Sequence, residues 1–507
     1  MLSLAVRNTQ KLVRLYSKRD NVRLGRHFTK KNTARLMADM LTFPQGKTSY
    51  TVLDAGAGTG ILSGAVIDAI CTRAPEARDI FLTCYENDET YLPMLEDNLE
   101  RMRKKCRHDY GVRLFYTVLP ENYLTDYKNH YAVTFFGNVE DKYDIIITNP
   151  PTELVKKGSP EADGAGGITS TSLSASYLFV RVASEHLEDG GQLVAVLPTT
   201  VATASALTDF RRDIAKRLSV RRIHLFVGSS KNAKRAIPLK KNILVCYENS
   251  SDRRDIQIST STDDGSAQGT VMLSPLPYSF VISEKDGTMT LPRNAEETKI
   301  VRYISMFPET LASLGLKMST GLVIEAKCGR IILDEERAGT IPLLRSSAMR
   351  GGYVCFPQTD VKGQFLLPVE SALFQRNKNM IIVKRIPAKS DERFLNAAMY
   401  FARQRPQNQY ISTHNKINFI DTVDKKDEMS FWLMHGLFAL LNSTIYDRYL
   451  SIVSKSKQIN SKELRELPLP PRNLIENIGS RLMAGGDISV AACDRIVNPT
   501  LHITVKS

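Results

Sequence analysis

Cysteine is scarce in this sequence and never paired. Seven cysteines are scattered over 507 residues, and no two of them form a CxxC pair. An odd, dispersed set argues against a disulfide framework and against a structural zinc site. We therefore expect a reducing cytoplasm and no bound metal.

Long apolar runs and internal repeats are absent as well. The longest apolar stretch, residues 431–441, has eleven residues and contains His435. Such a stretch is too short to cross a bilayer and is typical of a core helix. No repeat and no nuclease constellation can be recognised. The sequence thus indicates neither a membrane protein nor a nuclease.

Positive charge is in excess. The chain has 68 Lys and Arg against 54 Asp and Glu, a formal net charge of +14. Such a surplus favours a polyanionic partner, because neutralised phosphates release counterions, although a soluble protein can be basic without one.

The first nineteen residues contain five basic residues and no acidic one. This pattern is typical of an organelle transit peptide, and equally of a basic arm or helix packed on the rest of the protein. The motifs described below favour the arm, which we place at residues 1–20. The basic residues are Arg7, Lys11, Arg14, Lys18 and Arg19.

Length and pattern predict more than one domain. A chain of 507 residues is too long for one compact core. Short apolar runs alternate with amphipathic segments from residue 50 to about 250, which predicts an α/β domain, residues 21–250, with a mostly parallel sheet and helices on both faces. The expected strands are residues 50–53, 80–85, 143–148, 192–197, 222–226 and 242–247, with helices at 89–104 and 174–187.

The composition changes after residue 250. Residues 250–270 are rich in Ser, Thr, Asp and Gly, and we expect a linker or insertion over residues 251–295. Beyond it the pattern is mixed, with helices expected at 297–306 and 428–454. Residues 296–507 are therefore expected to form a second domain of mixed α/β structure.

A glycine-rich turn follows the first expected strand. The strand runs into Asp54, and Gly56, Gly58 and Gly60 follow at every second position before a helix. Glycine lets the backbone approach a ligand closely, and the helix N-terminus offers free amides. The spacing differs from the GxGxxG of dinucleotide binding. The second strand ends in Glu86, whose carboxylate can accept hydrogen bonds from both hydroxyls of a ribose.

The sequence Asn149-Pro150-Pro151-Thr152 follows a buried strand. The prolines fix their φ angles and lack amide protons, so the loop is stiff. It directs the Asn149 side-chain carbonyl and the Pro150 backbone carbonyl outward. Two such acceptors can bind both hydrogens of an exocyclic amine and stabilise the positive charge that develops as the nitrogen attacks a methyl group. After a glycine loop, this motif favours amine methylation over a simple turn.

The order of these motifs resembles that of a known family. Residues 25–29 (GRHFT), 54–60, Glu86 and 149–151 precede a long C-terminal region, as in the γ-class amino-methyltransferases of restriction–modification systems. The resemblance is closest to the TaqI-like enzymes and, among these, to the group of the BsuBI and PstI modification methylases. It covers nearly the whole chain and continues through short segments at residues 222–226, 319–321, 341–345, 352–357, 441–443, 458–460 and 467–470.

The resemblance implies a class I S-adenosylmethionine-dependent methyltransferase fold followed by a DNA target-recognition domain, residues 296–507. S-adenosylmethionine would be bound at Asp54, Gly56, Gly58, Gly60 and Glu86, and the partner would be double-stranded DNA. The implied reaction is adenine-specific methylation at N6 of a flipped-out base in the palindrome CTGCAG. The enzyme would be a bacterial cytoplasmic monomer that protects host DNA from a restriction endonuclease, which we expect to be a separate protein.

Four further residues are assigned by the resemblance. Phe28 and Thr29 would lie over the methionine end of the cofactor. Asn122 and Tyr123 stand where the family usually has Asp-Phe, a polar group for the cofactor's adenine amine and a ring stacked on it. Asp126 competes with Asn122 for the first role, and Tyr123 could simply be a core residue.

Two positions depart from the family. Position 152 is Thr where the family has an aromatic ring that stacks on the extruded base, and Ala233 occupies the place of a second ring. Stacking is worth about 1–3 kcal/mol per base, so the loss of one ring should weaken capture of the base roughly tenfold or more unless Tyr177 or Phe226 substitutes. We still expect activity, because the amine acceptors are intact.

Three alternatives stay open. Asn-Pro-Pro also serves methyltransferases that act on RNA or on protein glutamine, although these normally lack both the Phe28-Thr29 segment and such a C-terminal domain. Methylation of cytosine at N4 is more often associated with Ser before Pro-Pro. Thr152 leaves open a DNA-binding relative that has lost turnover.

Basic and polar residues of the second domain are candidates for DNA contact. Arg can bind guanine through two hydrogen bonds, Asn can bind adenine, and the remaining charges can hold phosphates. Each residue taken singly is more simply a phosphate contact or plain surface, as are Lys156 and Lys157 near the Asn-Pro-Pro loop. The candidates are Arg345, Arg350, Tyr353, Arg376, Lys378, Lys384, Arg385, Arg393, Arg403, Arg405, Tyr410, Asn415, Lys416, Lys455 and Lys457.

Overall fold

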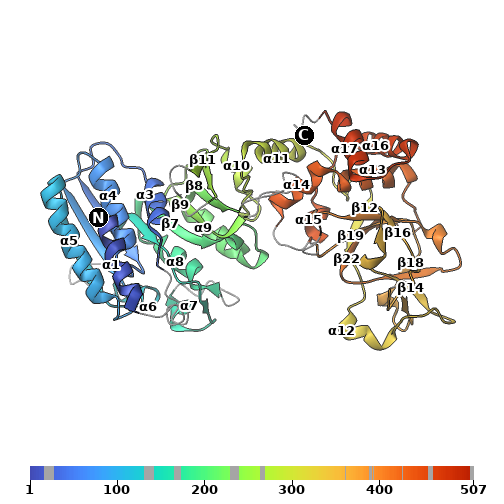
Figure 1. Ribbon diagram of the computed structural model, residues 1–507, viewed down its shortest axis with the longest axis horizontal. Coiled ribbons are helices and arrows are strands. Elements are labelled where there is room, and N and C mark those ends of the chain that lie inside the picture. Colours follow the sequence, from blue (N-terminus) through green and yellow to red (C-terminus); the bar gives the residue numbers. More distant parts are fainter. Residues whose placement is uncertain are drawn as a thin grey trace. The chain divides into compact units, whose positions relative to one another are not determined.

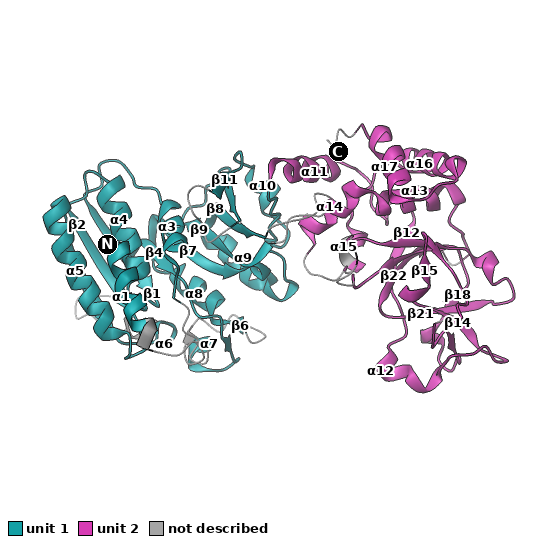
Figure 2. Ribbon diagram, viewed as in Figure 1, with its two compact units in different colours: residues 1–229, 237–293 teal, residues 230–236, 294–507 magenta. Residues whose placement is uncertain are grey.

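The computed structural model describes residues 1–15, 28–130, 142–164, 173–228, 239–262, 269–359, 361–387, 391, 393–424, 426–454, 459 and 461–502. These residues fall into two compact units, which meet in the sequence at Arg293 and Asn294 (Figure 2). Several residues named above lie outside the described residues, namely Lys18, Arg19, residues 25–27, Ala233, residues 455–458 and Asn460. Within the described ranges, no helix combines the length and the apolar character needed to span a membrane.

Unit 1, which ends at Arg293, is built on a nine-stranded sheet with the strand order β11-β10-β8-β9-β7-β4-β1-β2-β3. The row from β7 to β3 is parallel throughout, β9 is antiparallel to both of its neighbours, and β10 is again parallel to β8. The predicted mostly parallel α/β fold is thereby confirmed. The strands are β1 (Ser49–Ala55), β2 (Asp79–Tyr85), β3 (Arg113–Leu119), β4 (Tyr143–Thr148), β7 (Leu187–Pro198), β8 (Ser219–Val227), β9 (Leu239–Glu248), β10 (Gln257–Ser261) and β11 (Thr270–Met272), with a separate hairpin of β5 (Leu154–Val155) and β6 (Leu173–Ser174).

Helices cover both faces of this sheet (Figure 1). Because both faces are covered, β1 and β4 are almost continuously buried instead of alternating between buried and exposed positions. One core cluster joins α1 (Leu2–Leu15), α3 (Lys31–Asp39), α4 (Ile61–Arg73) and α5 (Leu92–Tyr110) to one face; a second joins α6 (Tyr123–His130), α8 (Ala175–Ala183), α9 (Thr208–Arg217) and α10 (Tyr278–Val281) to the other.

The expectation of a linker or insertion over residues 251–295 is corrected by the structure, because this segment contains β10. This strand, within the Ser- and Thr-rich segment, pairs with β8 in the main sheet. Ile258 is buried in the core, while Ser259 and Ser261 lie 2.8 and 3.0 Å from the two ring nitrogens of His224. The polar residues are therefore one face of a strand, which composition alone does not reveal.

Residues 2–15 of the basic N-terminal segment form a packed helix, one of the forms considered for it. α1 lies against α4, where a Cβ added to Gly64 would be 3.1 Å from the backbone nitrogen of Leu2. Leu2 and Ala5 of α1 are buried in the core on this side of the sheet. β3 was not among the expected strands; it forms the edge of the sheet, and only one of its residues is fully buried.

Unit 2, from Asn294, contains two further sheets and several helices. Its six-stranded sheet has the order β12-β22-β19-β20-β16-β15, and its five-stranded sheet the order β13-β17-β14-β21-β18. The helical block expected at residues 428–454 consists of two helices, because Ser443 ends the first and caps the second with its hydroxyl. Gly436 and Gly479 allow α13 and α16 to pack backbone against backbone.

The elements of unit 2 are α11 (Ala295–Ser305), β12 (Leu316–Thr320), α12 (Glu325–Cys328), β13 (Ile332–Leu333), β14 (Ile341–Leu344), β15 (Met349–Arg350), β16 (Tyr353–Val354), β17 (Phe365–Leu366), β18 (Gln375–Arg376), β19 (Met380–Lys384), β20 (Ala397–Tyr400), β21 (Tyr410–Thr413), β22 (Ile417–Thr422), α13 (Phe431–Asn442), α14 (Thr444–Val453), α15 (Ser461–Arg465), α16 (Arg472–Gly485) and α17 (Val490–Thr500).

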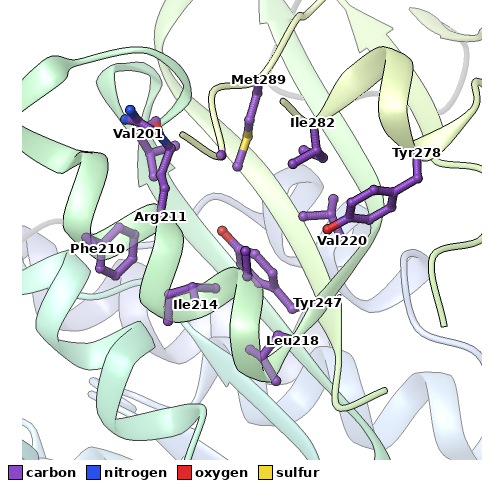
Figure 3. Close-up of a pocket in the computed structure, with 12 residues that line it drawn as sticks. Val201, Phe210, Arg211, Ile214, Leu218, Val220, Tyr247, Tyr278, Ile282 and Met289 are labelled. Carbon is purple, nitrogen blue, oxygen red and sulfur yellow. The ribbon is translucent and has the colours of Figure 1, made fainter. Parts of the chain in front are cut away.

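A small cavity lies in the core of unit 1, and Phe210, Tyr247 and Met289 are among the residues that line it (Figure 3). Its volume is about 20 Å³, enough for roughly one water molecule. Arg211 beside it donates hydrogen bonds to three backbone carbonyls and so serves the packing of this region. None of the expected site residues lines this cavity, and we regard it as a packing gap.

Candidate cofactor and catalytic site

The two expected motifs meet where the strand order of the sheet reverses. β1 lies between β2 and β4, and in open α/β sheets ligands bind at such a point, beyond the carboxyl ends of the strands. In the register Asp54 lies opposite Ile147, and the Thr148 hydroxyl donates to the Ala55 carbonyl at 2.7 Å. Neighbouring strands are about 4.8 Å apart, so the glycine loop and Asn149 begin side by side.

The glycine loop has a backbone conformation that demands glycine at three positions. Gly56, Gly58 and Gly60 have φ values of 78°, 56° and 81°. A Cβ on Gly58 would meet nothing within 4 Å, so the space beside this residue is open. α4 begins directly afterwards at Ile61, and its N-cap residue Gly60 has no side chain to cap it. The amides of Gly56, Ala57 and Gly60 donate to backbone carbonyls, so the loop offers a ligand close approach beside Gly58.

Two buried carboxylates hold this loop. Asp54 Oδ2 accepts hydrogen bonds from the amide and the hydroxyl of Ser63, at 2.9 and 2.6 Å. Burial raises the pKa of Asp54 to about 7. Glu86 accepts hydrogen bonds from the amides of Gly58 and Asp88, at 2.7 and 2.8 Å, and burial raises the pKa of Glu86 as well.

The residues present fit S-adenosylmethionine. A carboxylate has about four acceptor positions, and the described residues occupy one on each Glu86 oxygen. Both oxygens can therefore accept a ribose hydroxyl. Asp54 Oδ1 is buried without a hydrogen-bond partner among the described residues, which leaves a further acceptor at the same strand end. Within the described ranges, no group of three or more His, Cys, Asp or Glu could hold a metal ion.

α1 supports the glycine loop, and the sequence did not predict this contact. The Thr9 hydroxyl lies 2.6 Å from that of Thr59, a loop residue, and Asn8 donates to Asn98 at 2.7 Å. Asn98 in turn donates to the Thr59 carbonyl at 2.8 Å. These buried bonds join α1, the loop and α5. The partners of Thr9 and Asn8 lie 50 and 90 residues away in the sequence, so no local pattern could have revealed them.

Asn149 stands at the end of β4 with its amide held by a distant segment. Its Nδ2 donates to Thr29 Oγ1 at 2.9 Å, although the two residues are 120 positions apart. Asn149 and Thr29 are half-buried, Pro150 is buried, and Pro151 is exposed. The adjacent Phe28 is half-buried, with its ring centroid 5.4 Å from that of Tyr91. The structure thus brings Thr29 into contact with the Asn-Pro-Pro loop.

Asn122 and Tyr123 lie at the start of α6. The Asn122 side-chain oxygen accepts the amide of Leu124 at 3.0 Å, which makes it a local cap. Tyr123 is 2% exposed and packs against the rings of Tyr85 and Phe179. The structure therefore places Tyr123 in the core, the alternative considered for it, without an open face on which an adenine could stack.

Neither ring considered as a replacement for the missing aromatic has an open face. Tyr177 is 4% exposed, and its hydroxyl lies 3.0 Å from that of Thr200. Phe226 is 8% exposed and packs edge-on against His224, with ring centroids 4.8 Å apart. Thr152 itself is exposed beside the Asn-Pro-Pro loop.

Several of the basic residues considered for DNA contact make hydrogen bonds or ion pairs within unit 2. Fewer of the candidates are therefore exposed and unengaged in these bonds. Arg345, Arg385 and Arg393 donate to backbone carbonyls, Lys384 pairs with Asp391, and Arg405 pairs with Glu336. Lys378 is buried. By contrast, Arg376, Tyr410 and Lys416 are exposed, and Arg376 lies directly opposite Tyr410 across β18 and β21.

The fold is that of class I S-adenosylmethionine-dependent methyltransferases. Residues 76–232 match the family model described as Eco57I restriction-modification methylase. The chain is 25% identical over 490 residues to the Type II methyltransferase M.PstI of Providencia stuartii, an alignment covering 95% of this chain and 93% of that protein. It is 24% identical to M.BsuBI of Bacillus subtilis, covering 90% and 89%.

A solved structure shows the same fold. The type IIL restriction–modification enzyme MmeI, in complex with DNA, superposes with a TM-score of 0.51 at 10% identity, covering 90% of this chain and 71% of that one. The chain thus carries a restriction–modification methylase domain and is homologous to type II methyltransferases over most of its length. The predicted family resemblance is confirmed.

Proposed function

We propose that this protein transfers a methyl group from S-adenosylmethionine to N6 of an adenine flipped out of double-stranded DNA. In the bacterial cytoplasm it would act as a monomer and protect host DNA from a separate restriction endonuclease. The proposed target is CTGCAG, by similarity to the PstI and BsuBI group. The homologous modification methyltransferases and the net charge of +14 support DNA as the substrate.

The observation that carries this proposal is the position of Asn149 beside the glycine loop. The Asn149 side-chain carbonyl and the Pro150 backbone carbonyl provide two acceptors at the end of β4. This strand lies next to β1, whose end leads into the proposed cofactor loop. An adenine amine has two hydrogens, and both can be bound there. These bonds direct the nitrogen lone pair away from the acceptors and stabilise the charge that develops on nitrogen.

The other residues of the site would bind the cofactor and exclude water from it. Bound S-adenosylmethionine supplies an activated methyl group. Glu86 would accept hydrogen bonds from its ribose hydroxyls, the glycine loop would let it approach the backbone closely, and the half-buried Phe28 would cover one side. Extrusion of the base costs a few kcal/mol, which contacts from exposed residues such as Arg376 and Lys416 would offset.

The proposal is tested by methylating plasmid DNA with the purified protein and analysing the nucleosides by mass spectrometry. We expect N6-methyladenine, with protection of CTGCAG sites against cleavage. Methylcytosine as the product, or transfer only to RNA or protein, would contradict the proposal, and other protected sites would contradict the target alone.

Asn149→Ala should reduce methyl transfer by at least two to three orders of magnitude, as loss of a transition-state hydrogen bond does. DNA affinity, measured by gel shift, should change less than threefold. Asn477→Ala, at an exposed position of α16, is the matched control and should keep full activity. Full activity of Asn149→Ala would refute the proposed role of the loop.

A further inference from the structure

Thr29 holds the amide of Asn149, and this contact reaches beyond the cofactor role expected for it. The Thr29 hydroxyl oxygen accepts a hydrogen bond from Asn149 Nδ2 at 2.9 Å. Thr29 lies just before α3, whereas Asn149 directly follows β4. The contact therefore ties the N-terminal segment directly to the group that would bind the substrate.

The orientation of that amide decides whether the site can bind an amine. The final side-chain torsion of Asn has a broad, roughly two-fold preference, so the amide can turn over and exchange its oxygen and nitrogen. With the oxygen outward it accepts an N–H of the substrate. With the nitrogen outward it presents two donors to a group that itself donates. Prolines 150 and 151 fix the backbone but leave this side-chain torsion undetermined.

We infer that Thr29 is a positioning residue that holds the Asn149 amide in place, so that its carbonyl can meet the substrate amine. This inference rests on the proposed function. In the structure the Thr29 oxygen binds the nitrogen end of the amide. A substrate amine that donates its hydrogens selects the same orientation, because it needs Oδ1 as its acceptor. Thr29 thus acts through Asn149.

The test compares Thr29→Val, which keeps the branched shape but removes the acceptor, with Thr29→Ser, which keeps the acceptor. For Thr29→Val we expect a fall in kcat of about tenfold or more, which corresponds to one hydrogen bond, and a KM for S-adenosylmethionine within twofold of wild type. Thr29→Ser should recover kcat to within threefold. Thr29→Ala should behave like Thr29→Val, and Thr72→Val, at an exposed site on α4, is the control.

A second background separates positioning from simple structural support. In Asn149→Ser the shorter side chain does not reach Thr29, so adding Thr29→Val should change kcat less than twofold. An equal fall in both backgrounds would overturn the inference, as would a KM for S-adenosylmethionine raised tenfold at unchanged kcat. A Thr29→Val enzyme that makes N6-methyladenine at the wild-type rate would refute this inference alone, whereas a wild-type enzyme without that product would refute the proposed function.

Discussion

Glu86→Gln is the substitution whose effect the structure allows us to work out most fully. Both Glu86 oxygens accept backbone amides, Gly58 at 2.7 Å and Asp88 at 2.8 Å. Gln keeps the size but turns one oxygen into an NH2 group, which must then face an N–H donor. Hydrogen bonds to charged groups are worth about 1.5–3 kcal/mol, so the loss of one corresponds to roughly a tenfold to hundredfold change in an equilibrium constant.

The change should appear in cofactor binding, because Gly58 belongs to the loop that approaches the ligand and the same carboxylate would accept the ribose hydroxyls. Isothermal titration with S-adenosylmethionine should show a dissociation constant raised tenfold to hundredfold. Glu121→Gln, at an exposed site before α6, should bind as wild type does. Wild-type affinity of the Glu86→Gln protein would refute the assignment of the cofactor site to this strand end.

Three further predictions follow from other contacts. Thr9→Val leaves the buried Thr59 hydroxyl without its partner at 2.6 Å; it should cost about 1–3 kcal/mol in urea unfolding and raise the KM for S-adenosylmethionine, and an unchanged midpoint would contradict a role for α1 in the loop. Because burial raises the pKa of Asp54 from 3.8 to about 7, the stability contributed by its neutral form is complete below pH 3.8 and is lost as the pH rises through about 7. The always neutral Asp54→Asn should therefore gain unfolding free energy relative to wild type between pH 5 and pH 8, and parallel curves would contradict this pKa. Thr152→Tyr should lower the KM for DNA about tenfold by stacking on the extruded base, and no change would show that the ring is not needed.

Much of unit 1 could be predicted because its signals are local. β4 has the expected bounds, since an apolar run ending in Asn-Pro-Pro stops a strand sharply. The glycine loop was also predictable from the spacing of its glycines, and the structure adds their positive φ angles. β10 was not, since its Ser and Thr residues resemble a linker until their partner His224 is known.

Site residues show the same division. Asp54, Glu86 and Asn149 follow strands directly, and parallel strands carry such residues to one edge of the sheet. Tyr123 follows a strand too, yet it turns into the core, because its side chain fills a gap beside Tyr85 and Phe179. Position along the chain predicted which residues come near the edge and left the direction of each side chain open.

By itself the sequence determined the α/β fold, the edge where the ligand loop and the Asn-Pro-Pro loop meet, and the family to which both motifs point. These follow from periodicity, glycine spacing and proline stiffness, which act over a few neighbouring residues. Only the tertiary structure decided that Thr29 holds Asn149 and that Thr9 supports Thr59, at separations of 120 and 50 residues. A hydrogen bond needs two atoms within about 3 Å, and no pattern along one chain fixes that distance for residues so far apart.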